Sequence, residues 1–308
     1  MRTPIDLCVL SSQDWESLEI KEVIPRSFNY WDFDERRFKG NTLTYASTTE
    51  LLQKFILDSR ISAIICPPGV QLENDKATTP QTTGIYWHKN PREGFFLLHE
   101  FLANRITDQS STPTVIGKDC QISPRAEISA TDVVIGDNVV IEGGCVIQPG
   151  VTIGSHSRIG MGSTLGGAGF QYNRGSDGKL SLVSHIGSVL IEEDVFLHST
   201  VNVDKAIFLD ETRVGRGSKI DAHVQVSHAA RVGEDCLIAP GAVICGAVFI
   251  GDRTWIGPNS TVKDTLKVGS EAAISLGAVV TKNVQDNERV SGNFARPHGE
   301  FLKTLRQS

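Results

Sequence analysis

His228 is the residue whose type and position best suit proton transfer. It stands two residues after Val226 in the run Gln225-Val226-Ser227-His228, within a stretch where aliphatic residues recur at every sixth position. In repeats of that period the second residue after the aliphatic one tends to point outward, and an imidazole exchanges a proton near neutral pH. The position therefore suits a general base, although the spacing alone is more typical of a solvated or interface histidine.

Three further histidines lie near His228 in the sequence. His198 and His223 belong to the same repeats, whereas His185 lies in a break of the repeat pattern. No His-x-His or Cys-x-x-Cys spacing accompanies them, so we expect no metal site. His185 can either line a site or be exposed, because loops that interrupt a regular repeat often carry function.

The repeat that carries these residues predicts the fold. Helices need apolar residues at a 3.6-residue spacing and strands at alternate positions, so period six with β-branched residues fits short strands joined by tight turns. This is typical of a left-handed parallel β-helix of hexapeptide repeats. A glycine often follows the aliphatic residue, and we expect it to supply the turn's backbone angles. The aliphatic positions are Val214, Ile220, Val226, Val232, Ile238, Ile244, Ile250, Ile256, Val262, Val268, Ile274 and Val280.

The repeat extends over residues 115–284, with two breaks. It begins near Val115 and breaks first over residues 166–188 and then, more briefly, over residues 204–211. At three hexads per coil, this length predicts seven or eight coils. Residues 285–308 form a tail with a short helix predicted over residues 300–306.

Residues 1–108 lack the hexad and alternate strand-like with helix-like segments. This alternation predicts a small α/β domain. Thr48 or Thr49 is a candidate cap of one helix, and Asn90 with Pro91 marks the start of another. The predicted strands are residues 5–10, 61–66 and 84–88.

Composition narrows the class of protein. The net charge of −6 and the interspersed acidic and basic residues argue against a broad nucleic-acid-binding face. The six cysteines form no metal-type cluster, and no apolar run approaches membrane-spanning length. We therefore expect a cytoplasmic protein with reduced thiols.

Several motifs occur in a fixed order and spacing: Gly169-Phe170-Gln171-Tyr172, Ser184-His185-Ile186-Gly187, Asp204-Lys205, Lys219-Ile220-Asp221 and Gln225-Val226-Ser227-His228. Together they resemble the motifs of one enzyme family, the UDP-3-O-acylglucosamine N-acyltransferases of lipid A biosynthesis. The resemblance covers nearly the whole chain, and it also includes Leu43-Thr44-Tyr45, Asn90-Pro91-Arg92 and the tail from Ser291 to His298.

The resemblance implies a homotrimer with active sites between neighbouring β-helices. It implies that His228 is the general base, that the backbone N–H of Gly246 binds the thioester oxyanion, and that Tyr45 holds a uracil in the first domain. The other residues expected to bind substrate are Phe170, Tyr172, His185 and Gln225. Asp221, seven residues before His228, is expected to orient the imidazole or to stabilise its charged form, although a carboxylate in a turn has the same sequence signature.

The expected reaction is N-acyl transfer. A (3-hydroxy)acyl group moves from a thioester carrier, the acyl carrier protein, to the amine of a nucleotide-linked glucosamine, and no cofactor beyond the acyl thioester is needed. The family has Asn after its catalytic histidine where this chain has Ala229. This keeps open a coenzyme A-dependent N-acyltransferase of a nucleotide-linked aminodeoxy sugar for surface polysaccharide. The alternative of another class is a non-catalytic trimeric β-helix scaffold.

Overall fold

The computed structural model describes residues 12–24, 28–69, 83–107 and 111–292. The chain forms two compact units: Met1–Gln109 with Phe170–Ile186, and Ser110–Gly169 with Gly187–Ser308. The strand predicted over residues 5–10 and the helix predicted over residues 300–306 lie outside the described residues. None of the described helices is both long and apolar enough to cross a membrane.

The first unit contains a five-stranded sheet in the order β1-β5-β4-β3-β2. Strand β4 pairs in parallel with β3 and β5, and β1 pairs antiparallel with β5. The strands are β1 (Lys21–Ile24), β2 (Tyr30–Trp31), β3 (Thr42–Tyr45), β4 (Ile61–Cys66) and β5 (Gly84–Trp87), and the helical segments are α1 (Ser12–Ser17), η1 (Glu35–Arg37), α2 (Thr49–Ile56) and α3 (Pro91–Thr107).

Helices α2 and α3 both begin at the capping residues that the sequence predicted. The hydroxyl of Thr48 accepts a hydrogen bond from the Leu51 amide at 3.3 Å, which caps α2. The side chain of Asn90 accepts one from the Glu93 amide at 3.3 Å, directly before Pro91 opens α3. Helix α2 packs its Leu52 and Phe55 against the sheet, and α3 contacts β3 and β4.

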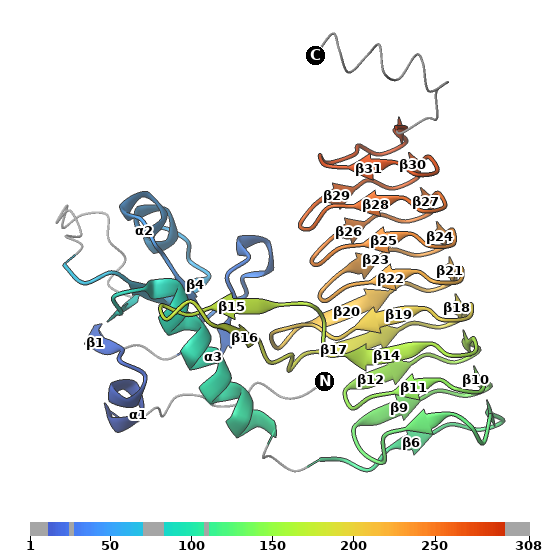
Figure 1. The fold of residues 1–308 in the computed structure, drawn as a ribbon, viewed down its shortest axis with the longest axis horizontal. Helices are drawn as coiled ribbons and strands as arrows, with labels where there is room; N and C mark the ends of the chain where they lie inside the picture. The colour runs from blue at the N-terminus through green and yellow to red at the C-terminus, as the bar shows by residue number, and fades with distance from the viewer. Residues whose placement is uncertain (1–11, 25–27, 70–82, 108–110, 293–308) are drawn as a thin grey trace, which may run out of the picture. The chain divides into compact units, whose positions relative to one another are not determined.

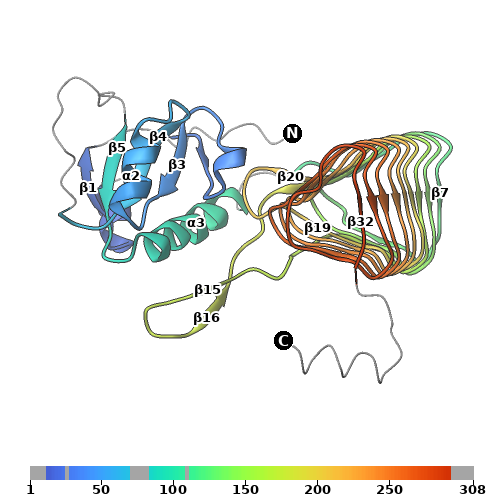
Figure 2. The same ribbon diagram turned by 90° about the horizontal axis from the view of Figure 1, so that it is seen from above.

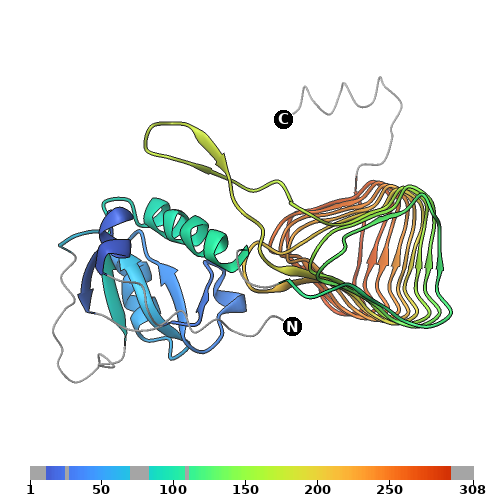
Figure 3. The same ribbon diagram turned by 90° about the horizontal axis from the view of Figure 1, so that it is seen from below.

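The first break of the repeat is a hairpin of the first unit. Strands β15 (Tyr172–Arg174) and β16 (Leu180–Leu182) pair antiparallel, and the hairpin runs beside α3 (Figure 3). The sequence predicted an excursion from the repeat here. The structure adds that this segment packs with the first unit.

The second unit is a parallel β-helix of three sheets, with nine, eight and eight strands. Figure 1 shows the coils stacked on one another, and Figure 2, looking along the stack, shows each coil as a three-sided loop. The predicted fold class is confirmed.

The strands of each sheet come from successive coils. The nine-stranded sheet comprises β7 (Gln121–Ile122), β10 (Val140–Ile141), β13 (Arg158–Ile159), β18 (Phe196–Leu197), β21 (Lys219–Ile220), β24 (Leu237–Ile238), β27 (Trp255–Ile256), β30 (Ala273–Ile274) and β32 (Arg289–Val290). The sheet that carries β22 comprises β8 (Glu127–Ile128), β11 (Val146–Ile147), β14 (Thr164–Gly167), β19 (Asn202–Asp204), β22 (Gln225–Val226), β25 (Val243–Ile244), β28 (Thr261–Val262) and β31 (Val279–Val280). The third sheet comprises β6 (Val115–Ile116), β9 (Val133–Ile135), β12 (Val151–Ile153), β17 (Ser188–Ile191), β20 (Glu211–Val214), β23 (Arg231–Val232), β26 (Phe249–Ile250) and β29 (Lys267–Val268).

The aliphatic residue of each hexad stacks on its equivalent in the next coil. Val226, for example, pairs with Val203 on one side and with Ile244 on the other, and all three are fully buried. The stack forms one continuous apolar core through the β-helix. Burial of each of these Val and Ile side chains contributes about 1.5–3 kcal/mol.

The glycines after the aliphatic residues have a different role from the predicted one. Gly215 and Gly233 do not have a left-handed φ; instead, a Cβ at either would lie 2.4–2.5 Å from atoms of the next coil. The left-handed angles occur two residues later, at non-glycine positions such as Asp235 (φ 52°) and Arg253 (φ 55°). These glycines are therefore needed because the coils approach closely, and the expectation about turn angles was wrong.

Candidate active site

His228 and Gly246 occupy the same position in two consecutive coils. His228 is the second residue after the stacked Val226, and Gly246 is the second residue after the stacked Ile244. Val226 and Ile244 pair in register. A Cβ built on Gly246 would lie 2.4 Å from Cε1 and 2.6 Å from Nε2 of His228. The imidazole therefore lies over the Cα of Gly246, and the structure brings together the two residues that the resemblance paired.

Gly246 is buried, and its backbone amide is not used within the coil stack. Its carbonyl accepts a hydrogen bond from the Thr265 amide at 2.9 Å, but among the described residues no acceptor takes its N–H. At another corner the equivalent amide of Glu234 is bound by the carboxylate of Asp252 at 2.9 Å. An amide without such a partner, next to an imidazole, suits a developing oxyanion.

The residue after His228 is held by a side chain that sequence reasoning missed. Ala229 has a left-handed φ of 56°, and its amide donates to Oγ1 of Thr212 at 2.8 Å. Thr212 is fully buried in β20. The signal was present in the sequence, because Thr212 is a polar residue at a repeat position where the adjacent coils have Val189 and Ala230.

Gln225 belongs to a closed ring of three side chains beside the catalytic candidates. Nδ2 of Asn202 donates to Asp204 and to Gln225, both at 2.8 Å, and Nε2 of Gln225 donates to Asp204 at 2.8 Å. Burial raises the pKa of Asp204, and the two amide donors oppose that rise. Asn202 and Asp204 were not predicted as site residues, although Asp204-Lys205 opens the second break of the repeat.

Asp221 is not placed beside His228. It follows β21 of the nine-stranded sheet, whereas His228 follows β22 of the next sheet, so the two lie at different corners of the coil. The Asp221 carboxylate lies 3.9 Å from Nδ1 of His198 and accepts the Ala222 amide at 2.7 Å. An orienting role of Asp221 on the His228 imidazole therefore finds no support in its position.

Two other histidines of the β-helix, His198 and His223, share the corner of Asp221. The His198 ring stacks on Phe196 with centroids 4.0 Å apart, and Nδ1 of His223 lies 2.7 Å from Oγ1 of Thr200. Within the described ranges no group of three or more His, Cys, Asp or Glu side chains is arranged to hold a metal ion.

Tyr45 stands at the end of β3 in the first unit, against an aromatic cluster. Its ring centroid lies 5.3 Å from that of Phe95, which in turn contacts Phe96 and Phe33. Burial raises the pKa of the Tyr45 hydroxyl, and the side chain is only partly exposed. The guanidinium of Arg92 lies 5.6 Å above the Phe96 ring. Aromatic faces and a cation thus gather at one end of this unit's sheet.

Phe170 and Tyr172 form a pair on the hairpin. Their ring centroids are 5.1 Å apart, Tyr172 faces Leu182 across the hairpin, and Phe170 is 89% exposed. His185, three residues beyond the paired strands, is buried, and its Nδ1 lies 2.8 Å from the carbonyl of Val183. His185 was expected either to line a site or to be exposed, and its burial excludes exposure.

Side chains of α3 fasten this hairpin at two points. Glu93 accepts hydrogen bonds from the amide and hydroxyl of Ser176 at 3.0 and 3.1 Å. Glu100 accepts the amide and hydroxyl of Ser184 at 2.8 and 2.6 Å. Next to it, His99 is fully buried and bonded on both nitrogens, to Trp31 at 2.8 Å and to the Ser184 carbonyl at 2.7 Å. The Phe170–Tyr172 pair is therefore held by α3.

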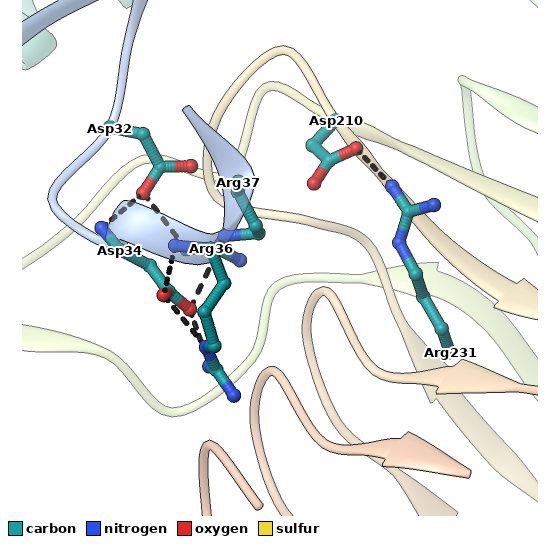
Figure 4. A network of polar contacts seen from close by, with 6 residues as sticks. All are labelled: Asp32, Asp34, Arg36, Arg37, Asp210 and Arg231. Carbon is teal, nitrogen blue, oxygen red and sulfur yellow. Dashed lines mark hydrogen bonds and ion pairs between the residues drawn. The ribbon is translucent and has the colours of Figure 1, made fainter. Parts of the chain in front are cut away.

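Figure 4 shows two groups of charged residues, one in each unit. In the first unit Asp32 and Asp34 bind Arg37 and Arg36 at the start of η1. Burial raises the pKa of Asp32 to about 6, and the neighbouring Arg37 offsets this only in part. In the second unit Arg231 binds Asp210 at 2.7 Å, which ties β23 to the second break of the repeat.

Two family models match parts of the β-helix. The bacterial transferase hexapeptide model (six repeats) matches residues 132–167 and 211–246. The hexapeptide repeat of succinyl-transferase matches residues 113–149 and 247–282. His228 and Gly246 both lie within the first of these models.

Individual curated relatives of this chain are acyltransferases. The chain is 33% identical over 145 residues to a UDP-3-O-acylglucosamine N-acyltransferase of Wolinella succinogenes, over 47% of this chain and 45% of that protein. It is 34% identical over 130 residues to the protein of that name from Campylobacter lari, over 42% of this chain and 40% of the relative. The matched region thus spans less than half the length of these curated relatives.

Solved structures support the fold. A UDP-N-acetylglucosamine acyltransferase from Campylobacter jejuni superposes with a TM-score of 0.52 at 22% identity, over 63% of this chain and 79% of that one. The one from Bacteroides fragilis 9343 gives 0.53 at 20%, over 64% and 74%. The chain is thus a hexapeptide-repeat β-helix protein similar to UDP-3-O-acylglucosamine N-acyltransferases, and the resemblance seen in its motifs is confirmed.

Proposed function

We propose that this protein is an N-acyltransferase that moves a (3-hydroxy)acyl group from a thioester to the amine of a nucleotide-linked glucosamine. The observation that carries the proposal is the imidazole of His228 lying over Gly246, a buried residue whose amide is not used by the coil stack. A base and an oxyanion donor are the two groups that aminolysis of a thioester needs, and here they are adjacent.

The proposed reaction uses these two groups in sequence. The sugar amine attacks the thioester carbonyl carbon, and His228 takes a proton from the attacking nitrogen. The N–H of Gly246 donates to the oxyanion of the tetrahedral intermediate. When the C–S bond breaks, the imidazolium returns its proton to the leaving thiolate, so the products are an amide and a free thiol. A positioned base contributes on the order of 100- to 10,000-fold to such a step.

The sugar nucleotide is the proposed acceptor because of the relatives' names and of the aromatic groups in the first unit. Tyr45 offers a partly exposed ring that can stack on a nucleobase, and Arg92 provides a cation for phosphate. The exposed rings of Phe170 and Tyr172 are proposed to contact the bound substrate. Gln225 is proposed to act together with Asp204 and Asn202.

The test is turnover of UDP-3-O-acylglucosamine with a 3-hydroxyacyl-acyl carrier protein, followed by mass spectrometry of the sugar product. We expect His228→Ala to lose roughly 100-fold or more in kcat while remaining folded. His223→Ala is the control, because His223 lies at another corner and bonds Thr200. Full activity of His228→Ala would remove His228 from the reaction. No acyl transfer by the wild type to any nucleotide amino sugar would favour a scaffold.

The donor is proposed to be the acyl carrier protein. The same assay run with the matching acyl-coenzyme A decides this point. A higher kcat/KM with coenzyme A thioesters, and with other nucleotide-linked aminodeoxy sugars, would replace this donor and assign the chain to surface polysaccharide synthesis.

The active form is proposed to be a homotrimer. Leu237 and Trp255 are adjacent in the nine-stranded sheet and remain 47% and 45% exposed, which is unusual for large apolar side chains on a regular sheet. Association of copies about a symmetry axis would cover them. Light scattering at micromolar concentration should give three times the chain mass, and a stable monomer would contradict the proposal.

A further inference from the structure

Most turns of the described coils share one hydrogen bond, and a different one replaces it at Ala229. In these turns the amide of the left-handed residue donates to a carbonyl of the preceding coil. Ala247 donates to the His228 carbonyl and Thr265 to the Gly246 carbonyl, both at 2.9 Å. Ala229, the equivalent residue directly after His228, donates instead to the hydroxyl of Thr212 at 2.8 Å.

The cause is the second break of the repeat, which lies in the preceding coil. Val203 pairs with Val226, and Val214 pairs with Val232. Six positions separate Val226 from Val232, whereas eleven separate Val203 from Val214. The longer connection leaves the regular path, so the carbonyl that would accept the Ala229 amide is not in place.

Thr212 can accept the Ala229 amide because β20 begins two residues before the pair Arg213–Arg231. Strand β20 begins at Glu211, so that Thr212 precedes the pair Arg213–Arg231 and lies in register with Ala230. The hydroxyl is fully buried in a column where Val189 is the neighbour in the preceding coil. A buried hydroxyl among apolar side chains requires a hydrogen-bond partner, and the Ala229 amide is the one found.

We propose that Thr212 is a positioning residue that holds His228 in its productive place, an inference that rests on the proposed function. Ala229 has φ 56°, which is unfavourable for a residue with a Cβ. Without an acceptor for its amide, Ala229 can leave the left-handed region, and this rotates the peptide that it shares with His228. The imidazole then moves from its place over Gly246.

The test compares three substitutions in the full-length protein. Thr212→Val removes the hydroxyl and keeps the shape, and Thr212→Ser keeps the hydroxyl. Thr254→Val is the matched control, since Thr254 is buried in the same β-helix and donates to the Gly269 carbonyl at 2.8 Å. We expect Thr212→Val to lower kcat roughly 10- to 100-fold with little change in either KM, because displacement of a catalytic group by about 1 Å has an effect of that order.

Thr212→Ser should restore most of kcat, and Thr254→Val should leave kcat unchanged. If Thr212→Val does not fold, Thr212→Cys serves the same comparison, because a thiol is a much weaker acceptor. Unchanged kcat in a folded variant without the hydroxyl would overturn the inference, and so would an equal loss in Thr254→Val.

A second readout does not depend on activity. Hydrogen exchange of the Ala229 amide should be faster in Thr212→Val than in the wild type and should return to the wild-type rate in Thr212→Ser. Equal exchange rates in wild type and Thr212→Val would overturn the inference. If His228→Ala proves fully active, the proposed function fails on that result alone, whereas the exchange rates still decide whether Thr212 holds this turn.

Discussion

The imidazole of His228 occupies the space that a side chain at position 246 would need. A Cβ on Gly246 would lie 2.4 Å from Cε1 of the ring, a separation that real Cβ atoms essentially never show. Gly246 does not have a left-handed φ. Its lack of a side chain is therefore required by the neighbouring ring and not by the backbone conformation.

Gly246→Ala should displace the His228 ring and leave the amide in place. We expect kcat to fall by about 100-fold, with the melting temperature close to that of the wild type, because the ring is only partly buried and can move. Steady-state kinetics and thermal unfolding measure the two effects. Gly292→Ala is the control, since nothing lies within 4 Å of a Cβ built there.

A double variant separates the steric effect from the loss of an oxyanion donor. Without the ring, the new methyl group has space, so Gly246→Ala should have almost no further effect in a His228→Ala background. If the two losses multiply instead, Gly246 acts independently of His228, and the steric account is wrong.

Gln225→Ala should destabilise the β-helix more than an ordinary surface substitution does. Gln225 both accepts from Asn202 and donates to the buried carboxylate of Asp204. Loss of a hydrogen bond to a buried charged group costs about 1–3 kcal/mol, which urea unfolding can measure. Gln121→Ala, at the equivalent outward position of β7, is exposed and should change the stability by less than about 0.5 kcal/mol. Equal effects would show that the ring contributes little.

The β-helix could be predicted from the sequence because its stabilising contacts repeat. The two members of each stacked pair, such as Val226 and Ile244, are eighteen residues apart, so the spacing of the aliphatic residues alone predicts the core. The same arithmetic places Gly246, eighteen residues after His228, directly against the ring. It also explains why Asp221 does not lie beside His228. Seven residues exceed one six-residue side of the coil, so the side chains of Asp221 and His228 lie at different corners.

The rest of the site depends on contacts that no local pattern shows. The hairpin is fastened by Glu93 with Ser176 and by Glu100 with Ser184, residues 83 and 84 positions apart. Thr212 and Asp204 matter because a longer connection interrupts one coil, and the sequence shows only that the repeat stops there. What fills the interruption is decided by packing.

The contribution of His99 to the stability of the first unit should fall as the pH is lowered. Burial lowers the pKa of His99 below its ordinary value of 6.5, while Ser184 and Glu100 oppose that shift. The unfolded chain therefore takes up the proton first. The stabilisation is fully present above pH 6.5 and is lost as the pH falls through the lowered pKa of the folded state. Protonation of Nδ1 would also break its hydrogen bond with Trp31.

Urea unfolding between pH 8 and pH 5 measures this loss. His99→Gln should be less stable at pH 8 but should have a flatter pH dependence than the wild type. His198→Gln should keep the wild-type slope of the first unit, because His198 lies in the β-helix. A wild-type slope that persists in His99→Gln would assign the acid sensitivity to another group.

Tyr45→Ala should weaken binding of the sugar nucleotide more than it slows the reaction. The ring is packed against Phe95 on one side and is partly exposed, so it can stack on a nucleobase distant from the reacting amine. Stacking of this kind acts on ground state and transition state alike, and its loss raises KM with little change in kcat. We expect KM to rise about tenfold, since stacking on an aromatic side chain contributes about 1–3 kcal/mol. Tyr45→Phe keeps the ring and should retain the wild-type KM. Calorimetric titration with uridine diphosphate checks the same loss without turnover. An unchanged KM and an unchanged affinity in folded Tyr45→Ala would identify Tyr45 as a core residue of the strand end.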